Sequence, residues 1–600
     1  MKNSYSNIFI VDDKRQFEQI ESNYNIKNDL VLTYDFALKK YIIDLGGDAE
    51  FIDHIISNEE LQKDNYIIYE FFKNWHYDKD GNDIFTFKGV PFGFSFREEF
   101  WSDFVSFIRL YVSLKYISKI IYHNLYLKSN DSFIIKILKE LKVDFKCFSN
   151  TDSETNRDGY FFLFSKWKDS KTRPTGLRGF LRKIRDKVSY YFAVIMPYLD
   201  KIYNKKNKYT IFIQDYHPTN KLIHELRNDK DITILLDNFS RFSNKLKNLQ
   251  ERLLPISGNA KDYEEIKDEL LEKFKINKYH NLILSDGSDV TVLIYEIILQ
   301  NISCFVVNKL RTLDSCIKYL DNNRVDLVVL IANIGHTATL FSLACKYKEI
   351  PSFLIINGIL LKNYQDEAKH AMYINAYSKS IKENYFRGMN NIVTLGDPRM
   401  DMYYKQQNKI NRIIPTITIG TSAYNFTDLN SYAAVEFDFM YDILKAFDIL
   451  KAKGEEFNII IKVRPDCYLK QYKDFIEEYF KDLEIKFFTT TPMIEVLKKT
   501  DFYISINSQT LLEASCLGIP VVYYKKDTEI TNAPFDNNSE LVTVNSIGDM
   551  VEAFVDFKEY HPRYNDFLDK NIMEKYIGYL DGKNFERNKS YIFELLQGKV

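Results

Sequence analysis

The chain has 600 residues, of which 45% are hydrophobic and 27% are charged, and its formal net charge is −2. This length exceeds what one hydrophobic core supports, so two or three domains are expected. The small net charge provides no global field that would attract nucleic acid, and we therefore exclude nucleic acid as a partner.

Cysteine spacing and hydropathy favour the cytoplasm. The six cysteines lie far apart and form no Cys-x-x-Cys pair, so we expect reduced thiols. No signal peptide is recognisable before the strand-like run at 8–11. The longest apolar run, at 190–199, is too short to span a bilayer, and the chain is expected not to cross one.

Residues 1–165 predict an accessory α/β domain. Short strands are expected at 8–11, 30–33 and 66–69, with helices between them and a helix at 100–127. Aromatic residues crowd the stretch 71–101, where Asp78, Asp83 and Arg97 lie among the rings. Two interpretations stay open: a core packed with rings, or a face that binds a glycan acceptor through rings and charged groups.

Residues 166–206 predict a basic amphipathic helix that links two domains. Between 166 and 187, nine residues are basic and two are acidic, and apolar residues recur beside them at helical spacing. One interpretation is a solvated linker helix. The other is an anchor through 166–199 on anionic lipid headgroups, which would hold the protein peripherally on the inner face of the plasma membrane.

The remaining chain alternates strands with helices, which is typical of parallel sheets and predicts two domains, 207–411 and 412–600. In the first we expect strands at 209–213, 233–236, 282–284, 326–332 and 352–356, and a strand that enters a tight turn at 392–399. In the second we expect strands at 416–419, 458–463, 485–488, 502–506 and 521–524, with helices at 435–453, 567–577 and 585–597.

The stretch 501–524 carries the clearest chemical signal. A buried strand leads through a polar loop into a short helix, and such a turn aims backbone N–H groups and a helix dipole at phosphate. Hydroxyl and amide groups at the helix start are predicted to stabilise the leaving-group phosphate without a metal: Ser505, Asn507, Ser508, Gln509 and Thr510. For each serine or threonine, simple helix capping is the alternative.

Residues 208–600 resemble the GT-B superfamily of glycosyltransferases and their relatives. The resemblance lies in the layout of 326–356, the Gly-Asp-Pro-Arg turn within 394–401, and the motifs at 492–501 and 508–520. It implies two Rossmann-like domains with a facing cleft, preceded by the accessory domain. The donor nucleotide would bind the carboxyl-terminal domain, at the carboxyl ends of its strands.

Departures from related families narrow the expected reaction. UDP-N-acetylglucosamine 2-epimerases carry acidic catalytic loops where this chain has 420–425, 333–335 and 357–359, so group transfer is favoured over epimerisation. Transferases that use cytidine-activated donors, such as Kdo and glycerophosphate transferases, place His-Pro where Arg464 and Pro465 stand here. Kdo transferases carry an aspartate at the place of Asp428.

The resemblance assigns roles to individual residues. Glu513 lies one helical turn inside the helix that follows the polar loop, and its carboxylate would accept hydrogen bonds from both ribose hydroxyls. The alternative is an exposed helix glutamate with a lysine partner. Arg464, beside Pro465, would bind phosphate or a donor carboxylate through its planar fork, or form a surface salt bridge. Asp428 would be the nucleophile of a retaining transfer or the base of an inverting one, unless it only caps the next helix. His336 and His217 are rival bases.

These observations predict a cytoplasmic glycosyltransferase of surface polysaccharide synthesis, such as capsule, lipopolysaccharide or O-antigen. The expected donor is a nucleotide sugar, with CMP-Kdo or another cytidine-linked donor favoured, and the acceptor a growing glycan that is free or lipid-linked. We expect neither a metal nor any other cofactor. The alternatives are a glycerophosphate or UDP-sugar transferase, an epimerase-like enzyme, or a non-catalytic scaffold of a glycan assembly complex.

Overall fold

The computed structural model describes residues 4–147, 208–237 and 251–599, apart from short gaps, and only seven residues between 148 and 207. The gaps are residues 12, 34, 53–54, 57, 129–131, 332–334, 361–367, 422–432, 465–468 and 527–529. The described chain contains three parallel β-sheets and one two-stranded antiparallel ribbon, formed by β4 (Thr86–Phe87) and β5 (Val90–Pro91).

The N-terminal unit is built on a five-stranded sheet with the order β3-β2-β1-β6-β7. Its strands are β1 (Asn7–Val11), β2 (Leu30–Thr33), β3 (Asp48–Phe51), β6 (Asn124–Lys128) and β7 (Lys146–Cys147). Its longer helices are α2 (Phe36–Asp44), α3 (Asn58–Asn74), α4 (Arg97–Ile117) and α5 (Ser132–Glu140), and a 3-10 helix, η3 (Gly93–Phe96), precedes α4. The first strand is central, as in doubly wound folds.

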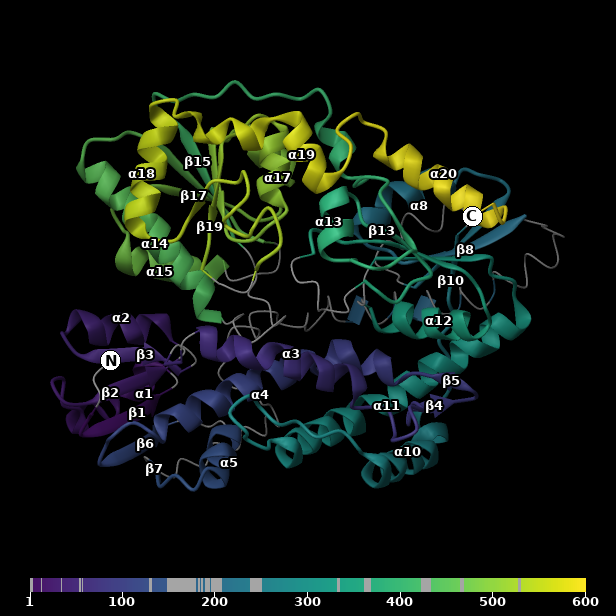
Figure 1. Ribbon diagram of the computed structural model, residues 1–600, viewed down its shortest axis with the longest axis horizontal. Coiled ribbons are helices and arrows are strands. Elements are labelled where there is room, and N and C mark those ends of the chain that lie inside the picture. Colours follow the sequence, from purple (N-terminus) through teal and green to yellow (C-terminus); the bar gives the residue numbers. More distant parts are fainter. Residues whose placement is uncertain are drawn as a thin grey trace.

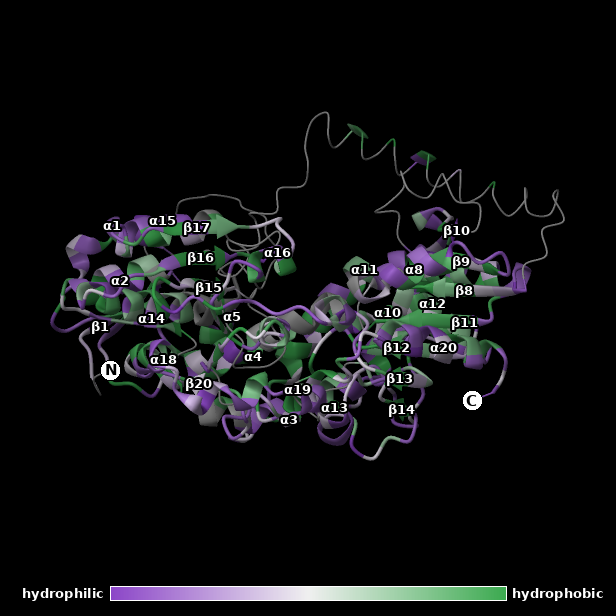
Figure 2. Cartoon of the chain, turned by 90° about the horizontal axis from the view of Figure 1, so that it is seen from above, coloured by the Kyte–Doolittle hydropathy of each residue, from purple (hydrophilic) through white to green (hydrophobic). Residues whose placement is uncertain are grey.

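The middle unit has a seven-stranded sheet with the order β10-β9-β8-β11-β12-β13-β14. Its strands are β8 (Tyr209–Ile213), β9 (Ile232–Leu236), β10 (Glu251–Leu253), β11 (Leu327–Leu330), β12 (Ser352–Ile355), β13 (Tyr373–Asn375) and β14 (Ile392–Val393). Its helices include α8 (Asn220–Leu226), α10 (Glu264–Asn277), α11 (Thr291–Asn322), α12 (His336–Tyr347) and α13 (Lys379–Asn384). Strand β11 is hydrophobic along its whole length and is green in Figure 2, as expected where helices cover both faces of a parallel sheet.

The C-terminal unit has a six-stranded sheet with the order β17-β16-β15-β18-β19-β20. Its strands are β15 (Thr416–Gly420), β16 (Asn458–Lys462), β17 (Ile485–Phe488), β18 (Phe502–Ser505), β19 (Val521–Tyr524) and β20 (Thr543–Val544). Its helices are α14 (Ala433–Ala452), α15 (Leu469–Tyr479), α16 (Met493–Leu497), α17 (Thr510–Cys516), α18 (Ile547–Lys558) and α19 (Lys570–Ile577). The predicted α/β class with two Rossmann-like domains is therefore confirmed.

The N-terminal unit packs against both other units. Figure 1 shows its sheet beneath the C-terminal unit, with α3 and α4 running on toward α10 and α11 of the middle unit. Phe51 at the end of β3 is fully buried in the core of the C-terminal unit, and Tyr479 of α15 donates a hydrogen bond to the Ala37 carbonyl at 3.3 Å. The accessory domain thus bridges the two Rossmann-like units.

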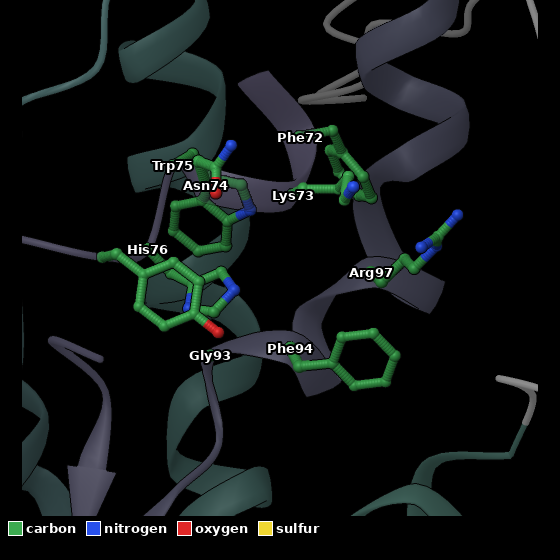
Figure 3. Close-up of a pocket in the computed structure, with 9 residues that line it drawn as sticks. Phe72, Lys73, Asn74, Trp75, His76, Gly93, Phe94 and Arg97 are labelled. Carbon is green, nitrogen blue, oxygen red and sulfur yellow. The ribbon is translucent and has the colours of Figure 1, made fainter. Parts of the chain in front are cut away.

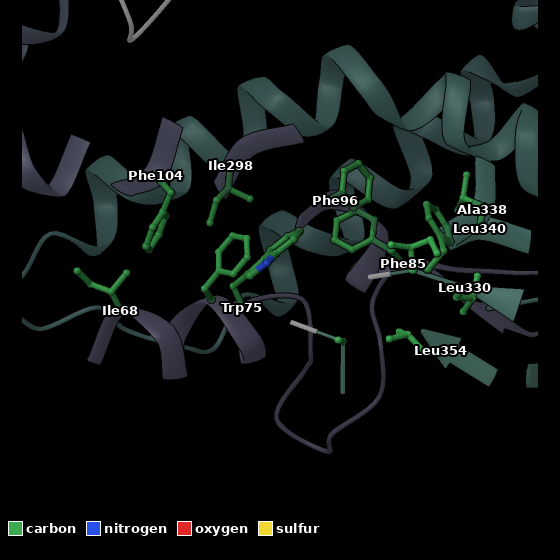
Figure 4. Close-up of a cluster of buried hydrophobic side chains, with 14 of the residues drawn as sticks. Ile68, Trp75, Phe85, Phe96, Phe104, Ile298, Leu330, Ala338, Leu340 and Leu354 are labelled. Carbon is green, nitrogen blue, oxygen red and sulfur yellow. The ribbon is translucent and has the colours of Figure 1, made fainter. Parts of the chain in front are cut away.

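One hydrophobic core joins the N-terminal helices to the middle unit. Figure 4 shows Trp75 close to Ile298 of α11, and Phe96 between Trp75 and the side chains of Ala338 and Leu340 of α12. The Trp75 ring lies 5.6 Å from Phe85 and 5.5 Å from Phe274 of α10, measured between centroids. Most of the aromatic cluster is therefore core, as the first of the two interpretations predicts.

The last helix, α20 (Asn584–Leu596), crosses back to the middle unit. Its Tyr591 ring lies 5.2 Å from Phe353 of β12, and the Lys221 ammonium of α8 lies 4.3 Å above the Phe585 ring. The predicted segment 412–600 is therefore not one packing unit, because its final helix belongs to the core of the segment 207–411.

Three predicted elements are wrong. Residues 66–69 lie inside α3 rather than in a strand, and 282–284 form only an isolated bridge between Ile283 and Asp289. The helix predicted at 100–127 begins earlier and ends at Ile117, after which β6 follows. Short apolar runs fit a strand and a buried helix segment equally well, which explains these errors.

Two features bear on membranes. Helix α11 is, among the described helices, the one long and apolar enough to cross a bilayer by length and composition, and 39% of its most apolar window is buried. Its buried side chains pack in the shared core, which is what a core helix of a globular protein does. The basic residues of the predicted linker lie outside the described residues, apart from exposed Lys187.

Candidate functional site

The carboxyl ends of two parallel sheets meet between the middle and C-terminal units. Gln509 follows β18 of the C-terminal sheet, and Gly358 follows β12 of the middle sheet. A Cβ added at Gly358 would lie 3.1 Å from Gln509 Oε1, so the two loops are in contact. Open α/β sheets bind ligands outside the carboxyl ends of their strands, and here two such edges face each other.

Gln509 closes a polar network across this boundary. The Arg399 guanidinium donates to Asp397 Oδ2 at 2.8 Å and to Gln509 Oε1 at 2.9 Å. The Gln509 amide donates to the same Asp397 oxygen at 2.6 Å. Asp397 is fully buried, and these donors supply the hydrogen bonds that a buried carboxyl group requires. Gln509 thereby links the two units and is not simply an open ligand group.

The turn that carries Asp397 and Arg399 is held by the last helix. Gly396 has φ +79, and a Cβ there would lie 1.9 Å from Asn584 Oδ1 of α20. The carboxylate of Asp401 accepts from the backbone N–H groups of Asn584 and Phe585 at 2.9 and 2.8 Å. The Gly-Asp-Pro-Arg turn recognised in the sequence is therefore the point where α20, the middle sheet and α17 meet.

Glu513 lies beside this network, in the first turn of α17, and is half-buried. Its carboxylate accepts a hydrogen bond from the Tyr403 hydroxyl at 2.8 Å. Burial raises the pKa of Glu513, whereas Arg399 and the Tyr403 hydrogen bond lower it. The alternative of an exposed glutamate with a lysine partner is wrong, because the partner is a buried tyrosine.

Three polar side chains line the start of α17 next to Glu513. The Thr510 backbone N–H donates to Ser508 Oγ at 3.3 Å, and the hydroxyls of Ser508 and Thr510 are 2.8 Å apart. The N-cap residue of α17 is Gln509, without a side-chain cap, so the predicted alternative of helix capping by Ser508 is not what the structure shows. The Ser508 contact with the Thr510 N–H is compatible with an additional phosphate contact. Asn507, Ser508 and Thr510 are all half-buried at the carboxyl end of β18. Their predicted phosphate contacts stay predictions.

Ser505 differs from its neighbours. Its side chain is fully buried, and its hydroxyl donates to the Gly420 carbonyl of β15 at 2.9 Å. A phosphate contact through this hydroxyl requires that hydrogen bond to break. We therefore assign Ser505 to holding two strand ends together and leave it out of the ligand site.

Arg464 follows β16 at the carboxyl edge of the C-terminal sheet. Its backbone N–H donates to Thr421 Oγ1 at 3.1 Å, and its side chain is exposed. The predicted surface salt bridge does not occur with any described residue, so the guanidinium is available to an anion at this edge. Pro465 and Asp428 lie outside the described residues, and their roles stay predictions.

His336 begins α12 at the carboxyl end of β11 and is half-buried. Its Nε2 lies 3.3 Å from Asn308 Nδ2 and 3.2 Å from Thr312 Oγ1, both on α11. Because Arg311 donates to the Asn308 amide oxygen at 2.9 Å, the Asn308 amide nitrogen faces the histidine, and Nε2 must accept. A role as general base through Nε2 would need this contact to open. The side chain of His217, the other rival, is not among those described.

Sequence reasoning missed three members of this site: Asp397, Arg399 and Tyr403. Asp397 and Arg399 belong to the turn at 394–401, which in the sequence indicates the fold and not the site, and Tyr403 lies two residues beyond that turn. Among the described residues, no group of three or more His, Cys, Asp or Glu could hold a metal ion. The expected metal independence stays a prediction.

No protein-family model and no curated protein matches the chain. Among solved structures, the UDP-GlcNAc 2-epimerase of Methanocaldococcus jannaschii in complex with UDP-GlcNAc and UDP is 15% identical, with a TM-score of 0.37 over 64% of this chain and 99% of that one. MurG of Acinetobacter baumannii is 13% identical, with a TM-score of 0.35 over 65% and 99%. The wall teichoic acid polymerase TagF is 12% identical, with a TM-score of 0.37 over 70% and 98%.

These identities and TM-scores carry no inference about substrate. The fold follows from the sheets themselves: two parallel, doubly wound sheets whose carboxyl edges meet. That is the GT-B fold of glycosyltransferases and their relatives, as the sequence resemblance implies.

Proposed function

We propose that the chain is a glycosyltransferase that takes its sugar from a nucleotide-activated donor. One observation carries the proposal: Glu513 and the polar start of α17 lie at the carboxyl edge of one sheet, against the carboxyl edge of a second sheet. In open α/β sheets this edge is where nucleotides bind.

Each group at the edge has a distinct chemical task in this proposal. The Glu513 carboxylate accepts the ribose hydroxyls, since a carboxylate offers several lone pairs. Negative charge grows on the leaving phosphate as the glycosidic bond breaks. The amides and hydroxyls of Asn507, Ser508 and Thr510, with the exposed Arg464 guanidinium, stabilise that charge.

Asp428 and His336 are the side chains assigned to the reaction itself, where one of them attacks the sugar or takes the proton of the acceptor. Asp428 is the nucleophile of a retaining reaction or the base of an inverting one, as its place in the sequence implies. His336 stands at the opposing sheet edge and is the second choice, since Asn308 already occupies its Nε2. Pro465 fixes the backbone after Arg464.

The favoured donor is CMP-Kdo or another cytidine-linked sugar, and the favoured product a surface polysaccharide such as capsule, lipopolysaccharide or O-antigen. This choice rests on Asp428 in the sequence resemblance, whereas Arg464 departs from the His-Pro pair of transferases that use cytidine-activated donors. A UDP-sugar or glycerophosphate donor uses the same edge and is the alternative within this fold.

Contact with the inner face of the plasma membrane is a further part of the proposal. The described residues between 180 and 195 are helical and exposed, and six of them are apolar. Phe180 is 60% exposed, Ile184 43% and Tyr191 62%. An apolar stripe flanked by basic residues suits an anionic lipid surface, where a lipid-linked acceptor would lie.

A non-catalytic scaffold is the second candidate. Asp397, Arg399 and Gln509 hydrogen-bond to one another and therefore need no ligand, which favours a scaffold. Thermal melts of the purified protein with CMP, CDP, UDP and GDP separate the candidates. A rise with CMP alone supports the acidic-sugar donor, and a rise with UDP or CDP supports the alternative donors. No rise with any nucleotide contradicts the proposed transferase and favours the scaffold.

A further inference from the structure

A pocket of about 250 Å³ lies in the N-terminal unit, where α3 ends and α4 begins. Figure 3 shows Trp75, His76, Phe94 and Arg97 arranged around it. This volume is below the roughly 300–1,000 Å³ of pockets that hold drug-sized ligands, so the pocket suits a single sugar ring rather than a nucleotide sugar.

The lining combines aromatic rings with cations. Phe72, Trp75 and Phe94 contribute rings, and Lys73 and Arg97 contribute positive charges. No acidic side chain occurs among the described residues that line the pocket. Rings pack against the apolar face of a sugar, and a guanidinium binds a carboxylate through two parallel hydrogen bonds. The chemistry selects a sugar that carries a negative charge.

The back of the pocket is rigid. Trp75 is 1% exposed and lies 6.2 Å from Phe96 between ring centroids. Nδ1 of the buried His76 ring lies 3.3 Å from Asp83 Oδ1 without a hydrogen bond between them. Asp83 Oδ2 accepts a hydrogen bond from the Gly93 N–H at 2.9 Å. A wall fixed in this way loses little entropy when a ligand binds. Half-buried Phe94 and Arg97 form the more open side.

The pocket is tied to the cleft through one turn of α11. Buried Lys309 donates to the Ser95 carbonyl, next to Phe94, at 2.8 Å. Its chain neighbour Asn308 and Thr312, one turn further along α11, contact His336 at the carboxyl edge of the middle sheet. The pocket therefore lies on the acceptor side of the proposed reaction site, away from the nucleotide edge.

We propose that this pocket binds one acidic sugar residue of the acceptor glycan, with the ring against half-buried Phe94 and the carboxylate on Arg97. The inference rests on the proposed transferase function and names the acceptor chemistry for it. Lys73 adds a second positive charge to the lining, although its ammonium lies 3.5 Å from Glu70 Oε1. A glycan held here by one residue would extend toward the cleft for transfer.

Binding of two monosaccharides that differ in charge tests this inference. Glucuronate and glucose share a pyranose ring, and only glucuronate carries a carboxylate. Saturation-transfer NMR on the full chain measures the affinity of each sugar for the wild type and for Arg97→Gln, Phe94→Ala and Arg15→Gln. Arg15 is an exposed arginine of the same unit and serves as the matched control.

The proposal predicts that glucuronate binds at least about ten-fold more tightly than glucose. Arg97→Gln should remove that preference, Phe94→Ala should weaken both sugars, and Arg15→Gln should change neither. Binding of neither sugar overturns the proposal, as does equal binding that Arg97→Gln leaves unchanged. If Arg97→Gln melts far below the wild type, Phe94→Ala alone decides whether the pocket holds the ring.

Thermal melts of the same proteins with nucleotides distinguish a failure of this proposal from a failure of the proposed transferase function. Arg97→Gln should retain the shift of the wild type, because Arg97 begins α4 of the N-terminal unit and is not one of the proposed nucleotide-binding residues. A wild type that binds glucuronate but no nucleotide counts against the transferase and not against the pocket.

Discussion

The Tyr403 hydroxyl donates to Glu513 Oε2 at 2.8 Å, which joins the turn after the middle sheet to the first turn of α17. Tyr403 is 4% exposed, so this contact is shielded from water. Burial and the nearby Glu513 charge raise the pKa of Tyr403, which keeps it a donor across the physiological range. A nucleotide whose ribose reaches Glu513 would find the carboxylate already oriented.

Loss of the Tyr403 hydroxyl should destabilise the protein. In Tyr403→Phe a partly buried carboxylate loses its donor, and we expect the free energy of unfolding to fall by about 1–2 kcal/mol. Urea denaturation measures the change. Tyr404→Phe, at an exposed neighbouring tyrosine, is the control and should leave the midpoint unchanged. Equal midpoints for all three proteins would refute the structural role of the contact.

The raised pKa of Glu513 predicts a pH dependence. Burial raises the pKa of Glu513 in the folded protein above the ordinary value of 4.5. The protonated carboxyl group therefore stabilises the fold fully below pH 4.5. This contribution to the free energy of unfolding is lost as the pH rises through the pKa of the folded protein. Ribose hydroxyls bind the charged form, so nucleotide affinity should increase with pH over the same interval. Calorimetric titrations across that interval test the sign, and Glu513→Gln should flatten the curve. An affinity that falls with rising pH would be inconsistent with the assigned role.

Alanine substitutions at two glycines with positive φ distinguish the cost of backbone strain from the cost of disturbing the packing of α20. Gly454 has φ +91 and no heavy atom within 4 Å of an added Cβ, so Gly454→Ala should cost about 1 kcal/mol. Gly396 has φ +79 and touches Asn584, so Gly396→Ala should cost at least about 2 kcal/mol more. Thermal denaturation of both variants gives the comparison. Equal losses would mean that α20 does not press on Gly396.

The apolar stripe between 180 and 195 predicts binding to anionic lipid. The wild type should float with vesicles that contain phosphatidylglycerol but not with neutral phosphatidylcholine vesicles, and salt should weaken the binding. Ile184→Asp together with Val188→Asp should abolish flotation. Ile413→Asp, at a residue that is 81% exposed elsewhere, should not. Flotation of the double variant like the wild type would exclude this stripe as the anchor.

The strands of the C-terminal sheet were predictable because they are short runs rich in β-branched and aromatic residues. The predicted strands at 416–419 and 485–488 match β15 and β17 within one residue. The run at 66–69 looks the same locally, yet it lies in α3, where the long-range core of α3, α4 and α11 decides its conformation.

The site was predictable in part for the same reason. Glu513 and the polar loop before it follow a strong strand signal, and the structure brings them to a sheet edge. The partners of Gln509 and Glu513 could not be predicted, because Arg399 and Tyr403 are each 110 residues away along the chain. Such contacts depend on how two sheets are oriented, which periodicity and spacing do not encode.

The central claim is that a nucleotide binds at Glu513, and calorimetric titration tests it most directly. CMP, or whichever nucleotide raises the melting point most, is titrated into the wild type, Glu513→Gln and Glu495→Gln, where Glu495 is a half-exposed glutamate of α16 paired with Lys498. We expect wild type and Glu495→Gln to bind alike and Glu513→Gln to bind at least about ten-fold more weakly. Equal affinity of all three proteins, or no binding to the wild type, would contradict the claim.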